Sequence, residues 1–138
     1  HAISSHWRRN RMMDGPPDCG IVLNYQEITP VLVGYDHNDM LSHVCMGYKD
    51  GLKRLNIDVH RYPVGGKSDL NVHPDQEQVY LILEGEGEVF VAGVSAQVKA
   101  GSFVFIPRRS LHKVTNLGET DLVLAFISVK LDPDDQNT

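Results

Sequence analysis

The sequence is poor in cysteine and has no long apolar run. Its 138 residues include two cysteines, Cys19 and Cys45, without a Cys-x-x-Cys pair. A disulfide framework is therefore not expected, and a reducing, cytoplasmic location is predicted. The longest uninterrupted apolar stretch, 122–127, is far shorter than the roughly 20 residues of a transmembrane helix. The N-terminal stretch is too polar to contain the apolar region of a signal peptide, so we expect no membrane association.

An excess of basic residues is also missing. Lys and Arg number 13 against 18 Asp and Glu, which gives a formal net charge of -5. Such a chain lacks the basic face that neutralises nucleic-acid phosphates, so we predict no nucleic-acid partner. The hydrophobic fraction of 41% and the charged fraction of 22% are near the globular average, which predicts one compact domain.

The two ends of the chain differ in composition from its middle. Residues 1–19 are predicted to be an N-terminal arm, since the first thirteen carry three arginines and no acid. This arm is a tag, a leader or a native segment that docks on a neighbouring subunit. Residues 20–131 form the predicted domain, and 132–138 form an acidic, solvated tail. We expect a homodimer in which N-terminal strands are exchanged or packed against the partner.

A helical stripe of apolar residues is absent from the domain. Short stretches rich in Val, Ile, Leu, Phe and Tyr recur instead, separated by turns that contain glycine. We predict strands at 20–25, 30–34, 55–62, 78–83, 87–91, 96–99, 102–106, 111–115 and 122–131. This pattern favours a closed or sandwiched all-β domain. The core is expected to include Phe90, Phe103, Phe105 and Phe126, whereas 36–43, with His37 and His43, is interpreted as a solvated loop.

Two blocks between Gly65 and Asn116 carry the chemistry. The first has Gly65, five residues, Asn71-Val72-His73, four residues, Gln78, and six residues before Gly85; the second has Gly101, five residues, Pro107, then Arg109, His112 and Asn116. The pair resembles the two signature motifs of the cupin superfamily, G-x5-H-x-H-x(3,4)-E-x6-G and G-x5-P-x-G-x2-H-x3-N. The resemblance implies an all-β fold, the cupin double-stranded β-helix or jelly-roll barrel. It says far less about the reaction, because this fold hosts many functions.

In the superfamily these motif positions hold a divalent metal. The resemblance therefore implies a metal set of Asn71, His73, Gln78 and His112, in which Asn71 replaces the first His and Gln78 replaces the Glu. Residues 71 and 73 share one face of an extended segment, and Gln78 shares its face with Tyr80. Glu77 is the alternative to Gln78, but it points to the other face unless a bulge intervenes. Tyr80 and His112 are the predicted catalytic residues.

The ligand substitutions change the expected chemistry. Two imidazoles with neutral amides leave more charge on a Zn, Ni, Mn or Fe ion than a set with a carboxylate does, which favours Lewis-acid chemistry over redox cycling. The first interpretation is a metal-dependent enzyme that isomerises, eliminates or cyclises a small oxygenated molecule. The alternatives are a metal-free cupin that binds a small ligand, a non-haem dioxygenase, and a sensor or storage protein.

Three further residues, His60, Tyr62 and Arg109, lie in or near these motifs. The sequence does not show which face of their strand His60 and Tyr62 occupy, and an ordinary position on the strand surface is favoured over a role in the pocket. Arg109 stands where the superfamily has glycine, which casts doubt on a tight turn there and suggests contact with a charged substrate.

Overall fold

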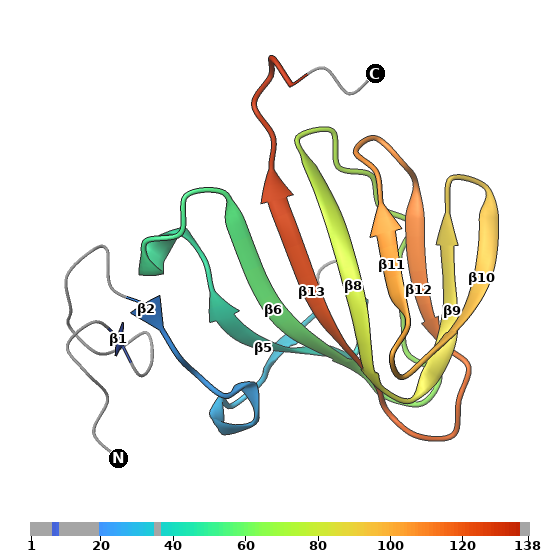
Figure 1. Ribbon diagram of the computed structural model, residues 1–138. Coiled ribbons are helices and arrows are strands. Elements are labelled where there is room, and N and C mark those ends of the chain that lie inside the picture. The colour runs from blue at the N-terminus through green and yellow to red at the C-terminus, as the bar shows by residue number, and fades with distance from the viewer. Residues whose placement is uncertain (1–6, 9–19, 35–36, 136–138) are drawn as a thin grey trace.

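The computed structural model describes residues 7–8, 20–34 and 37–135, and the fold is a sandwich of two antiparallel sheets (Figure 1). The strands are β1 (Trp7–Arg8), β2 (Gly20–Ile21), β3 (Val31–Val33), β4 (His37–Asn38), β5 (Met40–Met46), β6 (Leu55–Tyr62), β7 (Lys67–Ser68), β8 (Gln76–Glu84), β9 (Glu86–Val91), β10 (Val94–Lys99), β11 (Phe103–Ile106), β12 (His112–Asn116) and β13 (Leu122–Lys130). Two 3-10 turns complete the list, η1 (Tyr25–Glu27) and η2 (Tyr48–Asp50). No helix in the described ranges is long and apolar enough to cross a membrane.

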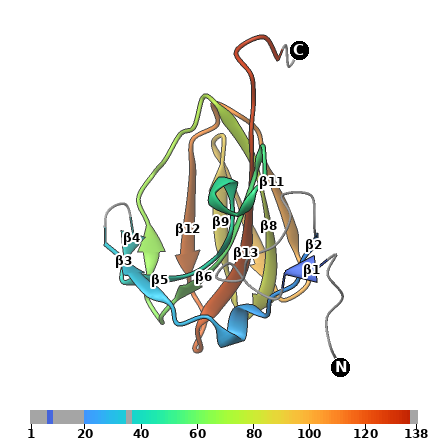
Figure 2. The same ribbon diagram turned by 90° about the vertical axis from the view of Figure 1, so that its left-hand side faces the viewer.

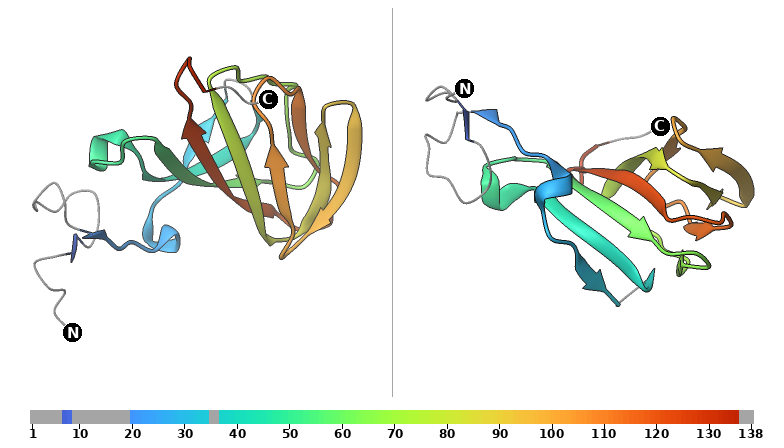
Figure 3. Two further views of the ribbon diagram at one scale, coloured as in Figure 1. Left: turned by 45° about the horizontal axis from the view of Figure 1, so that its top comes forward. Right: turned by 90° about the horizontal axis from the view of Figure 1, so that it is seen from below.

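One sheet has the strand order β10-β9-β12-β7-β4, and the other has the order β11-β8-β13-β6-β5-β3. Figure 2 is turned by 90° about the vertical axis from Figure 1, and it shows the strands of the two sheets surrounding the interior. The main core fills this interior and includes Ile82, Val89, Val114 and Leu124. A parallel pair, β1 with β2, lies away from the sandwich, as both views of Figure 3 show.

Strand β8 illustrates why the sequence folds in this way. Gln78, Tyr80 and Ile82 are buried, whereas the residues between them are only partly covered. This alternation is the period-2 pattern of a strand with one face toward a core. The turn after it needs Gly85, whose φ is +82° and whose added Cβ would lie 2.3 Å from the carbonyl oxygen of Asp121.

Several predicted strands are confirmed and two predictions about the N-terminal half are wrong. The predicted strand 20–25 is strand only at Gly20–Ile21, and Tyr25 begins η1, where the Asn24 side chain accepts a hydrogen bond from the Gln26 amide. The stretch interpreted as a solvated loop contains β4 and the start of β5. His43 is 5% exposed there, and its Nδ1 donates to the carbonyl of Ile28 over 2.8 Å. Of His37, the structure describes only its place in β4.

The phenylalanines were expected in the core, and two of them are not. Phe103 is 73% exposed and Phe105 is 57% exposed, since both lie on the outer face of the edge strand β11. Phe126 packs against the main core as predicted, and Phe90 is partly covered on β9. Most of the predicted N-terminal arm, all of it except Trp7–Arg8, lies outside the described residues, as does the end of the acidic tail.

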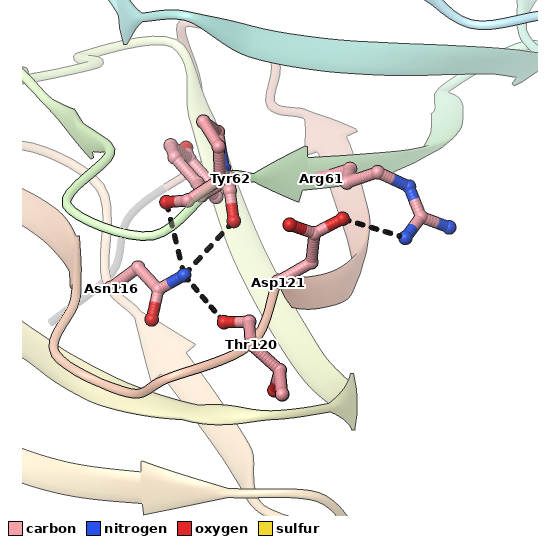
Figure 4. A network of polar contacts seen from close by, with 6 residues as sticks. Arg61, Tyr62, Asn116, Thr120 and Asp121 are labelled. Atoms are coloured by element: carbon pink, nitrogen blue, oxygen red, sulfur yellow. Dashed lines mark hydrogen bonds and ion pairs between the residues drawn. The ribbon is translucent and has the colours of Figure 1, made fainter.

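The last residue of the second motif holds three chain segments together. Asn116 is buried, and its side-chain nitrogen lies 3.0 Å from the carbonyl oxygens of Tyr62 and Pro63 and 2.9 Å from that of Thr120 (Figure 4). Its Oδ1 accepts from the backbone N–H of Gly118. Asn116 thereby ties the ends of β12 and β6 to the turn that leads into β13, at one end of the sandwich.

Candidate functional site

A small, largely enclosed cavity of about 130 Å³ lies between the two sheets, with Asn71 and His73 only half-buried at its wall. Its lining comprises His60, Tyr62, Ser68, Asn71, His73, Gln78, Tyr80, His112 and Phe126. All five site residues predicted from the sequence are in this set. They come from the segment before β8, from β8 itself and from β12, which are remote in sequence. Drug-sized ligands occupy roughly 300–1,000 Å³, so this cavity suits a molecule of a few heavy atoms.

Backbone pairing places the two motifs against each other. Asn71 and His112 form an antiparallel bridge in which each backbone N–H donates to the other's carbonyl over 2.9 Å. Directly opposed residues of such a pair project to the same side. The His73 carbonyl in turn accepts from the backbone N–H of Arg109 over 2.9 Å. As a result the His73 and His112 rings lie together, with centroids 5.3 Å apart and planes at 41°.

His112 is held as a neutral imidazole. Its Nδ1 lies 3.0 Å from the carbonyl oxygen of Ser110, and because a carbonyl only accepts, Nδ1 carries the hydrogen and Nε2 is left as a lone-pair donor. Burial lowers the pKa of His112; the Ser110 hydrogen bond opposes this and the nearby His73 reinforces it. A neutral ring whose other nitrogen is fixed by a backbone carbonyl is the usual state of a metal-binding histidine.

Gln78 and Tyr80 form a polar pair on the inner face of β8. The Tyr80 hydroxyl donates to Gln78 Oε1 over 3.2 Å, and Gln78 Nε2 donates to Gln76 Oε1 over 3.3 Å. Both residues are at most 5% exposed, and burial raises the pKa of the Tyr80 phenol far above its ordinary value. Tyr80 therefore stays protonated and orients the Gln78 oxygen. Glu77 is not in the cavity lining.

The described cavity lining contains no acidic residue and no lysine or arginine. Across the described ranges, no three His, Cys, Asp or Glu side chains gather as a metal set. Its candidate metal donors are instead two imidazoles and the amide oxygens of Gln78 and Asn71. Asn71 donates through Nδ2 to the Asp69 carbonyl over 2.9 Å.

Comparison with known proteins decides the family. Residues 58–129, more than half of the chain, match the family profile of the Cupin domain. The chain is a cupin. Over 121 residues this cupin is 31% identical to a protein of Thermotoga maritima named an oxalate-binding protein, a match that spans 81% of the chain and 96% of that protein.

Other relatives match over shorter stretches. An uncharacterized protein of Methanocaldococcus jannaschii is 38% identical over 66 residues, which are 48% of this cupin and 53% of that protein. The chain thus spans about half the length of that relative, and 52% of a second one from Aquifex aeolicus.

Solved structures show the same fold. A protein of Thermotoga maritima described as a predicted oxalate decarboxylase superposes with a TM-score of 0.75 at 24% identity, covering 80% of this cupin and 99% of that chain. The polyketide cyclase RemF from Streptomyces resistomycificus gives 0.68 at 16% identity, covering 77% and 76%. At these identities the likeness establishes the architecture alone.

Sequence reasoning missed four residues that line the cavity of this cupin: His60, Tyr62, Ser68 and Phe126. His60 and Tyr62 were favoured as ordinary surface positions, and this was wrong, since both are less than 9% exposed. Their partners across the ladder are the core residues Leu124 and Leu122. The missing information was the register between β6 and β13, which the alternation of residues along a single strand does not give. The His60 ring stacks on Phe126, with centroids 4.7 Å apart.

The chain makes a tight turn at Arg109, which stands where the superfamily motif has glycine. Arg109 has φ of 65°, the left-handed conformation that favours glycine, so the turn exists and the arginine adopts its strained backbone. The tight turn that the sequence put in doubt is therefore present. Arg109 is exposed and is not in the cavity lining. Its neighbour Arg108 donates to the backbone carbonyls of Pro74 and Asp135 instead.

Proposed function

We propose that this cupin is a metal-dependent enzyme that acts on a small carboxylic acid by Lewis-acid chemistry, of the isomerase, lyase or cyclase type. His73, His112 and Gln78, with Asn71 beside them, are the residues that would hold the divalent ion. The observation that carries the proposal is the convergence of these residues, taken from both motifs, on one small cavity between the sheets. The ion, when bound, polarises a carbonyl or carboxylate oxygen and stabilises the negative charge that develops on it.

The donor chemistry of the cavity fits such an ion. His112 has a free lone pair at Nε2 because Nδ1 is committed to Ser110. Gln78 Oε1 accepts one hydrogen bond from Tyr80, which leaves its second lone pair available. Zinc, nickel, manganese and iron all accept imidazole nitrogen, and the borderline ions tolerate amide oxygen.

Once a metal ion is bound, the absence of acidic side chains from the described lining favours an anionic substrate. A divalent ion held only by imidazoles and amides keeps its two positive charges, and an unbalanced charge is costly in a cavity that is largely enclosed by protein. A small carboxylate would supply the missing negative charge. The volume of about 130 Å³ limits the substrate to a few heavy atoms. The relative named an oxalate-binding protein agrees with this class of ligand.

The roles of the remaining residues follow from their contacts. Tyr80 is a positioning residue, since its hydroxyl fixes the Gln78 oxygen. The phenol also remains a hydrogen-bond donor across the physiological pH range, because its pKa is raised. Phe126, stacked against His60, forms an apolar wall that keeps water from one side of the cavity.

Metal content tests the proposal. Protein purified without a nickel column or a chelator should hold close to one divalent ion per chain by inductively coupled plasma mass spectrometry. His73→Ala and His112→Ala should each lose it. His60→Asn is the matched control, because it alters a cavity histidine outside the ligand set and should retain the ion. Wild-type protein that stays metal-free after incubation with each candidate ion would refute the metal site.

A metal-free ligand-binding cupin is the second candidate function. The absence of any carboxylate from the described lining favours it, since a site without an anionic ligand holds metal less tightly. In this function the two histidines and Gln78 would bind the carboxylate directly by hydrogen bonds. Isothermal titration of chelator-treated protein with oxalate distinguishes the two: binding without metal supports the second function, and binding only after metal is restored supports the first.

A further inference from the structure

The candidate metal ligands differ in what holds their backbone in place. Gln78 lies within β8 and His112 begins β12, so the hydrogen bonds of the sheets fix both residues. His73 lies before β8 begins, on backbone that belongs to no strand. Its position therefore depends on the groups that bind the carbonyls of residues 73–75, which we call the His73 segment. Such contacts affect metal affinity, because each ligand must be held in the productive geometry.

Each carbonyl of the His73 segment accepts a hydrogen bond from a part of the chain that is remote in sequence. The donors are two backbone N–H groups and one guanidinium: Arg109 N–H to His73 over 2.9 Å, Arg108 Nε to Pro74 over 3.0 Å, and Leu131 N–H to Asp75 over 2.8 Å. Pro74 has no N–H of its own, so its carbonyl is the one backbone hydrogen-bonding group that it offers. The loop between β11 and β12 and the chain after β13 therefore both hold the His73 segment.

Arg108 also joins the His73 segment to residues 131–135. Its Nη1 donates to the carbonyl of Asp135 over 2.9 Å, while its Nε donates to the carbonyl of Pro74. A guanidinium presents its donors in a rigid planar fork, so the two bonds together fix how the two carbonyls lie relative to each other. Figure 1 shows the end of β11, the end of β13 and the start of β8 at the same end of the molecule. One side chain thus bridges two segments beside the site.

Residues 131–135 contain a turn with an anchor of its own. The Asp132 N–H donates to Asp135 Oδ2 over 2.6 Å, and the Asp135 N–H donates back to the Asp132 carbonyl over 3.0 Å. The Arg54 guanidinium pairs with Asp132 Oδ2 at 2.6 Å. An exposed pair of this kind adds little to global stability, but it restricts the turn that carries the Asp135 carbonyl. Arg108 therefore bonds to an acceptor that is already held.

We propose that Arg108 is a positioning residue of the metal centre: it holds the His73 segment to residues 131–135 and so keeps the His73 ring beside the His112 ring. The inference rests on the proposed function, since the site that Arg108 serves is the candidate metal set. Arg108 is not in the described cavity lining, so it acts through the backbone and not by contact with the ion. Loss of a group that orients a metal ligand typically costs about 10–100-fold in metal affinity.

The Kd for Zn²⁺, compared with stability, tests this role. Arg108→Met keeps an unbranched stem and removes every donor, so it should raise the Kd about tenfold in titration calorimetry. The urea midpoint of the chelator-treated variant should stay close to that of the wild type, because exposed hydrogen bonds contribute little to folding. A merely structural residue would lower the midpoint and leave the Kd unchanged. Arg61→Met is the matched control: it removes the same charge from a pair with Asp121 and should not change the Kd.

Hydrogen exchange of chelator-treated protein gives a second readout, which needs no metal. The amides of Arg109 and Leu131 donate to the His73 segment and report whether it is held. Both should exchange at least about tenfold faster in Arg108→Met, because local opening no longer breaks the guanidinium bridge. Amides in the middle of β8 should exchange at the wild-type rate, and so should all of these amides in Arg61→Met.

The outcomes separate this inference from the proposed function. If the wild type binds Zn²⁺ and Arg108→Met binds it with the same Kd, the positioning role is overturned and the metal site stands. Unchanged exchange of the Arg109 and Leu131 amides would overturn the role in the same way. A wild type that binds no ion refutes the metal site, and the role with it. If Arg108→Met does not fold, Arg108→Lys takes its place; one ammonium does not reproduce the planar fork, so the Kd should still rise measurably, and an unchanged Kd contradicts the role.

Discussion

At the scale of single residues, Gln78 is the most informative substitution in the cavity. It stands where the superfamily motif has an acid, and the structure places its side chain, 2% exposed, among the two histidines and Tyr80. Its neutrality is the property on which the proposed preference for an anionic ligand depends. Replacing Gln78 with Glu changes the charge with almost no change in shape, and it therefore separates the effect on metal binding from the effect on ligand binding.

We predict that Gln78→Glu has opposite effects on metal and on ligand. The added carboxylate supplies an anionic metal ligand, so the Kd for Zn²⁺ or Mn²⁺ should fall by at least about tenfold. The same charge should repel a small dicarboxylate and raise the Kd for oxalate on the metal-loaded protein by a similar factor. Titration calorimetry measures both. A parallel change in the two constants would contradict the charge argument, and Glu77→Gln, outside the cavity lining, serves as the control.

His112 gives a prediction about pH. Burial lowers its folded-state pKa below the unfolded value of about 6.5, so the unfolded chain binds the proton more readily. The free energy of unfolding of chelator-treated protein should be fully present above about pH 6.5 and should decline as the pH falls below it, by at most about 1.4 kcal/mol per pH unit from this group. Urea unfolding at pH 7.5, 6.5 and 5.5 measures the slope. The His112→Asn variant should have a smaller slope; equal slopes would refute the assignment.

At the scale of elements, the sequence predicted the strands that are rich in Val, Ile, Leu, Phe and Tyr and flanked by turns, and missed those whose burial depends on other segments. Strand β8 was predicted in this way, and the structure shows buried and half-buried residues alternating along it. The stretch 36–43, which contains the start of β5, was interpreted as a loop because His and Asp residues cluster in it, yet His43 is buried there beside Ile28 and Tyr25, which come from another segment. Similarly, Phe103 and Phe105 have strand alternation, but alternation does not say whether their face meets the core or a second molecule.

Asn116 carries a prediction about the joint between elements. Its amide is the hydrogen-bond partner of three backbone carbonyls at the ends of β6 and β12. Asn116→Ala should lower the free energy of unfolding by about 2 kcal/mol or more, since buried carbonyls lose their donor. Asn116→Asp should cost more, because a carboxylate would face three carbonyl oxygens. Urea unfolding measures both. The exposed Gln97→Ala, which loses a 3.4 Å contact with Glu88, should change stability by less than about 0.5 kcal/mol.

At the scale of the whole molecule, the sequence predicted the fold because two motifs were in register over some fifty residues, and the family match confirms it. The five predicted site residues converge for the same reason, since the bridge between Asn71 and His112 joins the motifs. Three further lining residues, His60, Tyr62 and Phe126, depend on how β6 and β13 pair, and Ser68 depends on the pairing of β7; no local pattern specifies either. Assembly depends on surfaces whose exposure appears only when the chain is folded.

The final prediction concerns coupling between metal, anion and global stability. A ligand that binds only the folded state raises the free energy of unfolding by about 2.7 kcal/mol at a hundredfold excess over its Kd. Because the cavity lining is neutral and the ion supplies the positive charge, oxalate should raise the melting temperature of metal-loaded protein by several degrees and leave chelator-treated protein unchanged. Reciprocity then requires oxalate to tighten metal binding by the same factor by which metal tightens oxalate binding. Thermal unfolding in the four combinations of metal and oxalate measures this coupling, and equal stabilisation by oxalate with and without metal would show that the anion binds the protein groups directly.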